Sequence, residues 1–295
     1  MDGVLVVDKP EGWTSHDVVG RVRRIARTKR VGHLGTLDPM ATGVLPLVIG
    51  RATRLAQFFG RDQKIYEGVI RFGHSTDTYD REGKPTSEPV GVSITLEQLE
   101  IALDCYRGEF EQMPPPVSAK KIGGTPAYKL VRSNQPVELK AVPVTIFSLE
   151  VLSFDGRDAA VRVACSAGTY IRGIAHDVGR QLGCGAFLQQ LRRTSSGGFS
   201  IESARTLDQL AALADEEHLD QAIVSATELL PEFPNELVDS FTAGQIRQGR
   251  DFHVSPFRIR SGKYVKAVTP EGELIAIGEA RLPNVYHPVL VFPNE

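Results

Sequence analysis

The residues best suited to chemistry lie in one short loop, GHLGTLDPMATG, which spans residues 32–43. Its three glycines and one proline predict a tight turn that presents a few polar side chains, among them the single carboxylate Asp38. Asp38 stands between Leu37 and Pro39, and a carboxylate held among apolar neighbours can act as a nucleophile or a base. An aspartate can also simply accept backbone N–H bonds within a turn, and the loop alone favours that structural role.

A catalytic carboxylate in such a loop needs a cation beside it. Burial raises the pKa of a carboxyl group, whereas a neighbouring guanidinium keeps the group ionised. Arg172 is a candidate, because it opens a predicted helix directly after the glycine turn at Gly168. A surface position, where most arginines lie, is the alternative for this residue.

Other catalytic motifs are absent from the sequence. It contains no G-x-x-x-x-G-K-[ST] phosphate loop, no G-x-G-x-x-G after a strand and no G-x-S-x-G elbow. The histidines form no H-x-x-x-H pair and the cysteines no C-x-x-C motif, so a zinc site is not expected. The polar loop at residues 77–83 lacks the alternating oxygen ligands of a calcium-binding loop. The residues therefore predict carboxylate chemistry with no metal and no cofactor.

The charge of the chain is unevenly distributed. Its 34 Lys+Arg and 36 Asp+Glu give a formal net charge of -2, which by itself argues against a nucleic-acid partner. Residues 1–64, however, carry a net charge of +5, and residues 201–240 carry one of -9. The positive excess is concentrated in residues 21–30, which hold six basic and no acidic side chains. This stretch is either a solvated helix face or a phosphate-binding patch.

The sequence also bears on location and assembly. Three widely spaced cysteines favour a reducing compartment, and neither a signal peptide nor a membrane-spanning apolar run is present. A cytoplasmic protein is therefore expected, without a membrane partner. Because no heptad pattern or exposed apolar stripe is apparent, we expect a monomer.

The elements that must position Asp38 and Arg172 are short strands mixed with helices. Strands are predicted at residues 4–7, 44–49, 65–72, 142–154 and 159–164. Helices are predicted from residue 15, at 95–106, at 169–182 and along the acidic stretch 205–230. Beyond residue 241 several short strand candidates follow one another. This mixture predicts an α+β protein rather than regular βαβ alternation.

The loop at residues 32–43 resembles the signature of the TruB family of tRNA pseudouridine synthases. Four further blocks match that family in the same order: GVLVVDKPEGWTS (3–15), the run from Lys64-Ile65-Tyr66 to the 76–80 loop, GTYIR (168–172), and residues 183–199 with Leu191-Arg192-Arg193. The resemblance covers at least residues 3–200, and the C-terminal part is similar to a short PUA domain.

This resemblance implies a pseudouridine synthase fold, with a mixed, largely antiparallel central sheet flanked by helices. It places the catalytic domain at residues 1–234, with an RNA-clamping insert at about 117–140, and a small β-rich, PUA-like RNA-binding domain at 235–295. The insert contains Lys120, Lys121, Tyr128, Lys129 and Arg132, a composition that suits a segment ordered by phosphates.

The activity implied by the resemblance is isomerisation of uridine-55 in the T-loop of tRNA to pseudouridine. The reaction breaks the glycosidic bond, rotates the uracil and rejoins it through C5, with no cofactor and no metal. The partner is the T-stem-loop of tRNA, and the target base must be flipped out of its stack to reach the site.

The resemblance also assigns roles to individual residues. It makes Asp38 the catalytic nucleophile, pairs Arg172 with it, and places Tyr66 against the flipped uracil as a stacking surface and candidate base. Whether Asp38 attacks C1′, attacks the base or assists departure of the uracil stays open. The further substrate or RNA contacts that it implies are His33, in the gap left by the flipped base, and Tyr170, Leu191, Lys9, Lys121 and Arg192. For Tyr170 and Leu191, simple core packing is the alternative.

Two other functions compete with this interpretation. One is a tRNA-binding or RNA-folding module without catalysis, although Asp38, Tyr66 and Arg172 are all present. The other is a glycoside or nucleoside hydrolase, which would need a second carboxylate such as Asp80. The sequence departs from the expected family pattern at Arg54, where we expect a lysine, and in its short C-terminal part.

Overall fold

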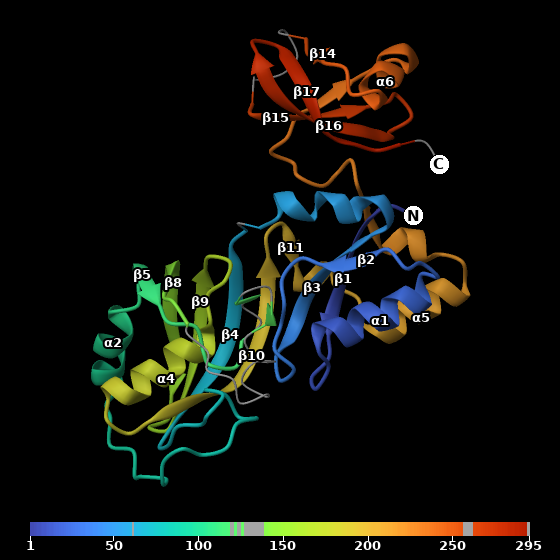
Figure 1. Ribbon diagram of the computed structural model, residues 1–295. Coiled ribbons are helices and arrows are strands. Elements are labelled where there is room, and N and C mark those ends of the chain that lie inside the picture. The colour runs from blue at the N-terminus through green and yellow to red at the C-terminus, as the bar shows by residue number, and fades with distance from the viewer. Residues whose placement is uncertain (61, 119–120, 123–124, 127–138, 256–261, 294–295) are drawn as a thin grey trace.

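The largest element of the fold is a ten-stranded sheet with the order β12-β1-β3-β10-β4-β9-β8-β5, in which β2 also pairs with β3 and β11 with β10. The computed structural model describes residues 1–60, 62–118, 121–122, 125–126, 139–255 and 262–293 (Figure 1). The strands of the large sheet are β1 (Gly3–Lys9), β2 (Val31–His33), β3 (Thr42–Ile49), β4 (Lys64–Phe72), β5 (Gly108–Gln112), β8 (Val142–Phe154), β9 (Asp158–Cys165), β10 (Ala186–Ser196), β11 (Phe199–Ser200) and β12 (Ile223–Ser225). A separate hairpin pairs β6 (Lys121–Ile122) with β7 (Thr125–Pro126).

Helices cover one face of this sheet in two groups (Figure 1). In the first group α1 (Ser15–Ile25) packs against β2 and α5 (Leu207–Asp215) against β1; in the second, α2 (Leu96–Asp104) packs against β8 and α4 (Ile171–Gln181) against β10 and β4. The single-turn or irregular 3-10 segments are η1 (Gly50–Phe58), η2 (Ile201–Ser203) and η3 (Leu219–Ala222). All four α-helices contribute to one apolar core with the sheet face beneath them. No helix among the described residues is long and apolar enough to cross a membrane.

One parallel pairing brings the loop at residues 32–43 to the middle of the sheet. Thr42 and Gly43 pair with Arg192 and Arg193 of β10, whereas β1 and β2 pair with β3 in the antiparallel sense. Gly43 has a φ of 99°, and a Cβ there would lie 2.2 Å from the carbonyl oxygen of Arg193. Only glycine permits this approach, so the loop that carries Asp38 is fixed beside β10.

A second sheet of five strands follows, in the order β13-β15-β16-β17-β14. Its elements are β13 (Asn235–Leu237), α6 (Ser240–Arg247), β14 (Phe252–His253), β15 (Tyr264–Val268), β16 (Leu274–Leu282) and β17 (Val285–Val291). This sheet has a core of its own, and it shares another core with η1 and with the face of the large sheet opposite α1, α2, α4 and α5. At the junction the buried ammonium of Lys266 donates to the carbonyls of Thr227 and Leu229, at 2.7 and 2.8 Å.

The mixed, largely antiparallel sheet with flanking helices confirms the predicted α+β class. The predicted helix over 205–230 is wrong beyond Asp215, because Glu217 adopts a φ of 62° and the chain then forms β12. That strand pairs with β1 and thereby covers an edge that would otherwise expose unpaired backbone groups. Strand β10 has no counterpart among the predicted strands, because a buried arginine and two register shifts interrupt its apolar pattern.

Candidate active site

A cavity of about 630 Å³ opens on the helix-covered face of the large sheet. Strands β4 and β10 contribute to its lining, as do the loop after β2 and the start of α4. Six of the residues singled out from the sequence line it: His33, Asp38, Tyr66, Tyr170, Arg172 and Leu191. Residues up to 158 positions apart in the chain thus meet at one cavity.

The loop that carries Asp38 is fixed by hydrogen bonds on both sides of that residue. The Ser15 hydroxyl accepts a bond from the Leu37 N–H at 2.9 Å and donates to the Leu37 carbonyl at 3.1 Å. The Pro39 carbonyl accepts bonds from the Gly12 N–H at 2.9 Å and from the Lys9 ammonium at 3.1 Å. Because both flanking peptide groups are held, the position of the Asp38 carboxylate is well determined.

Arg172 pairs with Asp38 across the cavity wall. Its Nε donates to Asp38 Oδ2 at 2.9 Å, and its two Nη atoms donate to the carbonyls of Thr78 and Val117, at 2.8 and 2.7 Å. The Arg172 side chain is only 5% exposed, whereas that of Asp38 is 34% exposed. A buried guanidinium with three fixed acceptors therefore holds a carboxylate that still faces open space.

Asp80 lies in the loop that supplies one of these acceptors. It is buried, and its Oδ1 accepts bonds from the Thr78 hydroxyl at 2.6 Å and from the Glu82 N–H at 3.0 Å. Burial raises the pKa of its carboxyl group, while Thr78 and Arg172 act in the opposite direction. These contacts give Asp80 a part in shaping the loop that receives Arg172.

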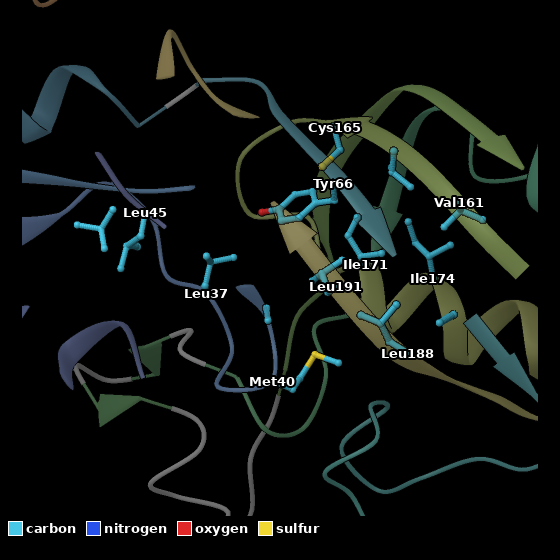
Figure 2. Close-up of a cluster of buried hydrophobic side chains, with 14 of the residues drawn as sticks. Leu37, Met40, Leu45, Tyr66, Val161, Cys165, Ile171, Ile174, Leu188 and Leu191 are labelled. Carbon is cyan, nitrogen blue, oxygen red and sulfur yellow. The ribbon is translucent and has the colours of Figure 1, made fainter. Parts of the chain in front are cut away.

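Tyr66 presents its ring to the cavity from β4. The residue is 7% exposed, and in Figure 2 its hydroxyl points toward the side of the cluster where Leu37 lies. Burial raises the pKa of its phenol, and the nearby Arg193 guanidinium opposes that shift. The phenol is therefore protonated at neutral pH and can donate a hydrogen bond.

Two buried cations, Lys64 and Arg193, lie on the same side of the cavity as Tyr66. Arg193 has no exposed surface and donates to the carbonyls of Val44 and Gly35, at 2.7 and 3.1 Å. Burial lowers the pKa of the Lys64 ammonium, and the charge of Arg193 lowers it further. Within the described ranges neither cation forms an ion pair within 4 Å, and the charge of Asp62 acts on Lys64 only from further away, so this wall is net positive. The sequence interpretation did not single them out, although Arg193 stands two positions after Leu191 and so shares its strand face.

His33 and Tyr170 also line the cavity, but their side chains make fewer hydrogen bonds than that of Arg172. The Nδ1 atom of His33 is buried and has no hydrogen-bond partner among the described residues. Burial lowers the pKa of this imidazole, so the ring is neutral at physiological pH. Tyr170 is held through its backbone, because the Gln112 side chain bonds both its N–H and its carbonyl, at 2.8 and 2.9 Å. Leu191 is 9% exposed at the cavity wall.

Three of the expected RNA contacts do not join this group. Lys9 has no exposed surface, and its ammonium donates to the carbonyls of Pro10, Trp13 and Pro39; an RNA contact by this residue stays a prediction. Arg192 does not line the cavity and instead pairs with Asp8 through two bonds, at 3.1 and 2.8 Å.

The third, Lys121, is described only through its backbone in β6, and its side chain lies outside the described residues. The other insert residues named from the sequence, Lys120, Tyr128, Lys129 and Arg132, also lie outside the described ranges. In the described part of the chain, no group of three or more His, Cys, Asp or Glu side chains is arranged to hold a metal ion.

Comparison with known proteins places this cavity in a family. A model of the TruB family pseudouridylate synthase N-terminal domain matches residues 23–171, and one of the tRNA pseudouridylate synthase B C-terminal domain matches residues 172–231. The chain belongs to the TruB family. This confirms the family membership that the loop at residues 32–43 predicted. The two matched regions together end before β13, so the five-stranded sheet lies beyond them.

Relatives of this TruB family chain extend over its full length. It is 63% identical to the tRNA pseudouridine synthase B of Solibacter usitatus (strain Ellin6076) over 292 residues, which are 99% of this chain and 100% of that protein. It is 44% identical to the tRNA pseudouridine synthase B of Thermobifida fusca (strain YX) over 300 residues, covering 99% and 98% of the two chains.

Solved structures show the same fold. A chain in the structure of an H/ACA RNP bound to a substrate RNA containing 2'-deoxyuridine has a TM-score of 0.72 at 26% identity, covering 99% of this chain and 85% of that one. A chain of a Cbf5-Nop10-Gar1 complex gives a TM-score of 0.70 at 26% identity, with coverages of 99% and 84%. The fold is that of the pseudouridine synthases, as predicted.

Proposed function

We propose that this protein isomerises uridine-55 in the T-loop of tRNA to pseudouridine. The observation that carries the proposal is the Asp38–Arg172 pair, which faces Tyr66 across one cavity in a chain of the TruB family. The names of the relatives support tRNA as the substrate. The reaction breaks the C1′–N1 bond, forms a C1′–C5 bond and moves the C5 proton to N1, so no external reactant is consumed.

Asp38 is the catalytic carboxylate in this proposal, and its Oδ1 atom is the reactive one. Oδ2 accepts the bond from Arg172, while Oδ1 has no hydrogen-bond partner in the part of the chain that the structure describes. A carboxylate with one oxygen fixed and the other free can approach C1′ or the base from a defined direction. Arg172 acts as its orienting cation, because its Nε holds Oδ2 at 2.9 Å.

The remaining cavity residues receive the flipped base. The Tyr66 ring gives the uracil a stacking surface, and its protonated phenol enters the reaction as a hydrogen-bond donor. The positive wall of Lys64 and Arg193 stabilises negative charge that develops on the uracil when the glycosidic bond breaks. His33, at the cavity entrance side of β2, fills the gap that the base leaves in the loop.

The proposal also assigns a function to each domain of the chain. Residues 1–234 form the catalytic domain, with the RNA-clamping insert at about 117–140. Residues 235–295 form a PUA-like RNA-binding domain, which is supported by the separate five-stranded sheet and its own core. We further propose that the protein acts as a monomer on the T-stem-loop in the cytoplasm.

Incubation with an unmodified tRNA transcript tests the proposal directly. Pseudouridine is mapped at nucleotide resolution after reaction without added metal, and a transcript with cytidine in place of uridine-55 is the control. We expect one modified position, in the T-loop, and none in the control. Pseudouridine at another position, or in no position, would overturn the substrate assignment.

A further inference from the structure

A second hollow lies beside the substrate cavity, on helix α1. It measures about 550 Å³ and is lined by Gly12, Trp13, His16, Asp17, Gly20 and Arg24; we call it the Trp13 hollow. Two observations place it next to the cavity. The Ser15 side chain bonds Leu37 beside Asp38, and the charge of His16 contributes to the lowered pKa of His33.

Trp13 is an exposed aromatic residue in this hollow. It is the single tryptophan of the chain, and 36% of it is exposed. Its carbonyl accepts a bond from the Lys9 ammonium at 2.6 Å, and the same ammonium donates to Pro39 at 3.1 Å. The backbone of Trp13 is therefore fixed to the catalytic loop, while its indole ring is available to a ligand. An open aromatic face of this kind suits a nucleobase, since every base can stack.

Gly20 forms part of the same hollow in the interior of α1. A Cβ at this position would meet no atom within 4 Å, and the backbone needs no left-handed conformation there. Because alanine is the better residue in a helix interior, folding does not explain the glycine. The bare backbone instead leaves room for a flat group to approach the helix.

The charge of the hollow suits a phosphate. Arg24 is exposed and forms no ion pair with any residue that the structure describes. Asp17, the acidic residue of the hollow, accepts bonds from the Thr14 N–H and hydroxyl, at 2.9 and 2.6 Å. These bonds direct the carboxylate toward the start of the helix, so the hollow combines Arg24 and His16 with one acidic side chain held by Thr14. Arg24 also lines an adjoining hollow together with Arg21, so the positive surface continues along α1.

We propose that the Trp13 hollow binds a second nucleotide of the substrate RNA, with its base stacked on Trp13 over Gly20 and its phosphate at Arg24. This inference rests on the proposed function and adds an anchor outside the cavity of the flipped uridine. Because Ser15 joins α1 to Leu37, the anchor and the Asp38 carboxylate belong to one rigid unit. The second nucleotide therefore sets the distance between the RNA backbone and Asp38.

The single tryptophan gives this proposal a direct readout. The Asp38→Asn variant, which we expect to bind RNA without turnover, is titrated with unmodified tRNA. Tryptophan emission is recorded, and binding is measured in parallel by filter retention. We expect saturable quenching with the midpoint of the filter assay. Binding that leaves the emission unchanged would overturn the inference and leave the proposed function intact. Absence of binding in both assays would overturn the proposed function, and this inference with it.

Substitutions test the contact independently. Trp13→Ala should raise the Kd and KM for tRNA about tenfold with kcat little changed, whereas Trp13→Phe keeps a stacking ring and should restore most of the affinity. Arg24→Gln should reduce the slope of log Kd against log salt by about 1. Phe147→Ala removes a 57% exposed aromatic ring on β8 and serves as the matched control, with unchanged Kd.

Binding of two RNAs shows which part of the tRNA supplies the nucleotide in the Trp13 hollow. If Trp13→Ala weakens binding of both an isolated T-stem-loop and full-length tRNA, the nucleotide belongs to the hairpin. If it weakens binding of full-length tRNA alone, the nucleotide belongs to another part of the molecule. Wild-type affinity of Trp13→Ala for both RNAs would overturn the inference and would favour a protein ligand for the hollow.

Discussion

Two consecutive arginines of β10 lie in different regions of the molecule. Arg193 faces the cavity, has no exposed surface and donates to the carbonyls of Gly35 and Val44. Arg192 points to the other side of the strand, where its 41% exposed side chain pairs with Asp8 in the hollow that Arg21 and Arg24 also line. Successive side chains of a strand point to opposite faces of the sheet. Two adjacent arginines can therefore point one into the cavity and the other to a solvent-exposed surface.

The two faces differ in how their charges are held. On the cavity face, Arg172 and Arg193 are buried and each is fixed by several acceptors, so a substitution there displaces groups that have one defined position. On the opposite face, the Arg192–Asp8 pair is screened by solvent, and exposed pairs contribute little to stability. Substitutions should therefore have large effects on the cavity face and small effects on the other.

Asp38→Asn should have the largest effect. It keeps the shape of the side chain and its bond from Arg172 but removes the nucleophilic charge, so kcat should fall at least about a thousandfold. Single-turnover formation of pseudouridine in a tRNA transcript measures the loss, and filter binding should show a Kd within severalfold of wild type. Near wild-type turnover by this variant would show that Asp38 is not the catalytic carboxylate.

Arg172→Lys should have the next largest effect. The arginine donates to three acceptors: Asp38 Oδ2 and the carbonyls of Thr78 and Val117. A lysine keeps the charge but can reach only some of them. We expect kcat to fall roughly a hundredfold, with a much smaller change in KM, because the loss concerns orientation in the transition state. Arg180→Lys, on an exposed part of the same helix, is the matched control. Equal activity of Arg172→Lys and wild type would exclude the ion pair from catalysis.

Some residues of the cavity can be predicted from the sequence, and others cannot. The loop of Asp38 combines an unusual glycine spacing with a single carboxylate, and the family resemblance connects it with Tyr66 and Arg172, which the structure places around one cavity. Strand β10 was missed because Arg193 interrupts its apolar pattern, and a buried arginine can be recognised only once its carbonyl acceptors from a distant loop are known.

The surroundings of Lys9 and Arg192 could not be predicted for a related reason. A lysine in a turn, such as Lys9, looks like a surface cation in the sequence, since burial of a lysine requires acceptors that sequence alone does not reveal. Three backbone carbonyls supply those acceptors here, one of them from residue 39. The face of Arg192 likewise follows from the register of β10 against β3 and β4, which tertiary pairing sets.

The buried Lys9 predicts a change of stability with pH. Burial lowers the pKa of its ammonium to about 8 in the folded protein, against 10.5 for an ordinary lysine. Between these values the unfolded chain holds a proton that the folded chain has released, so this group makes the fold more stable as pH rises. Relative to Lys9→Met, wild type should gain about 2 kcal/mol in unfolding free energy from pH 7 to pH 9.5.

Urea unfolding of both proteins at several pH values measures this gain, because titrations common to the two chains cancel in the difference. The gain should begin near pH 8, where the folded-state ammonium loses its proton. A difference that stays constant over the range would show that Lys9 keeps an ordinary pKa when folded.

Arg192→Gln should have the smallest effect and tests the opposite face directly. The substitution removes the exposed pair with Asp8, so the unfolding free energy should fall by no more than about 1 kcal/mol. Its KM and kcat for tRNA should stay within about twofold of wild type, since its guanidinium is engaged by Asp8 and lines neither the cavity nor the Trp13 hollow. Arg193→Gln, one residue further along β10, is the matched variant, and it should lose activity because Gly35 and Val44 lose their donor. A tenfold or larger rise in KM for Arg192→Gln would mean that RNA also contacts this face of the sheet, and that strand alternation alone does not separate the two arginines.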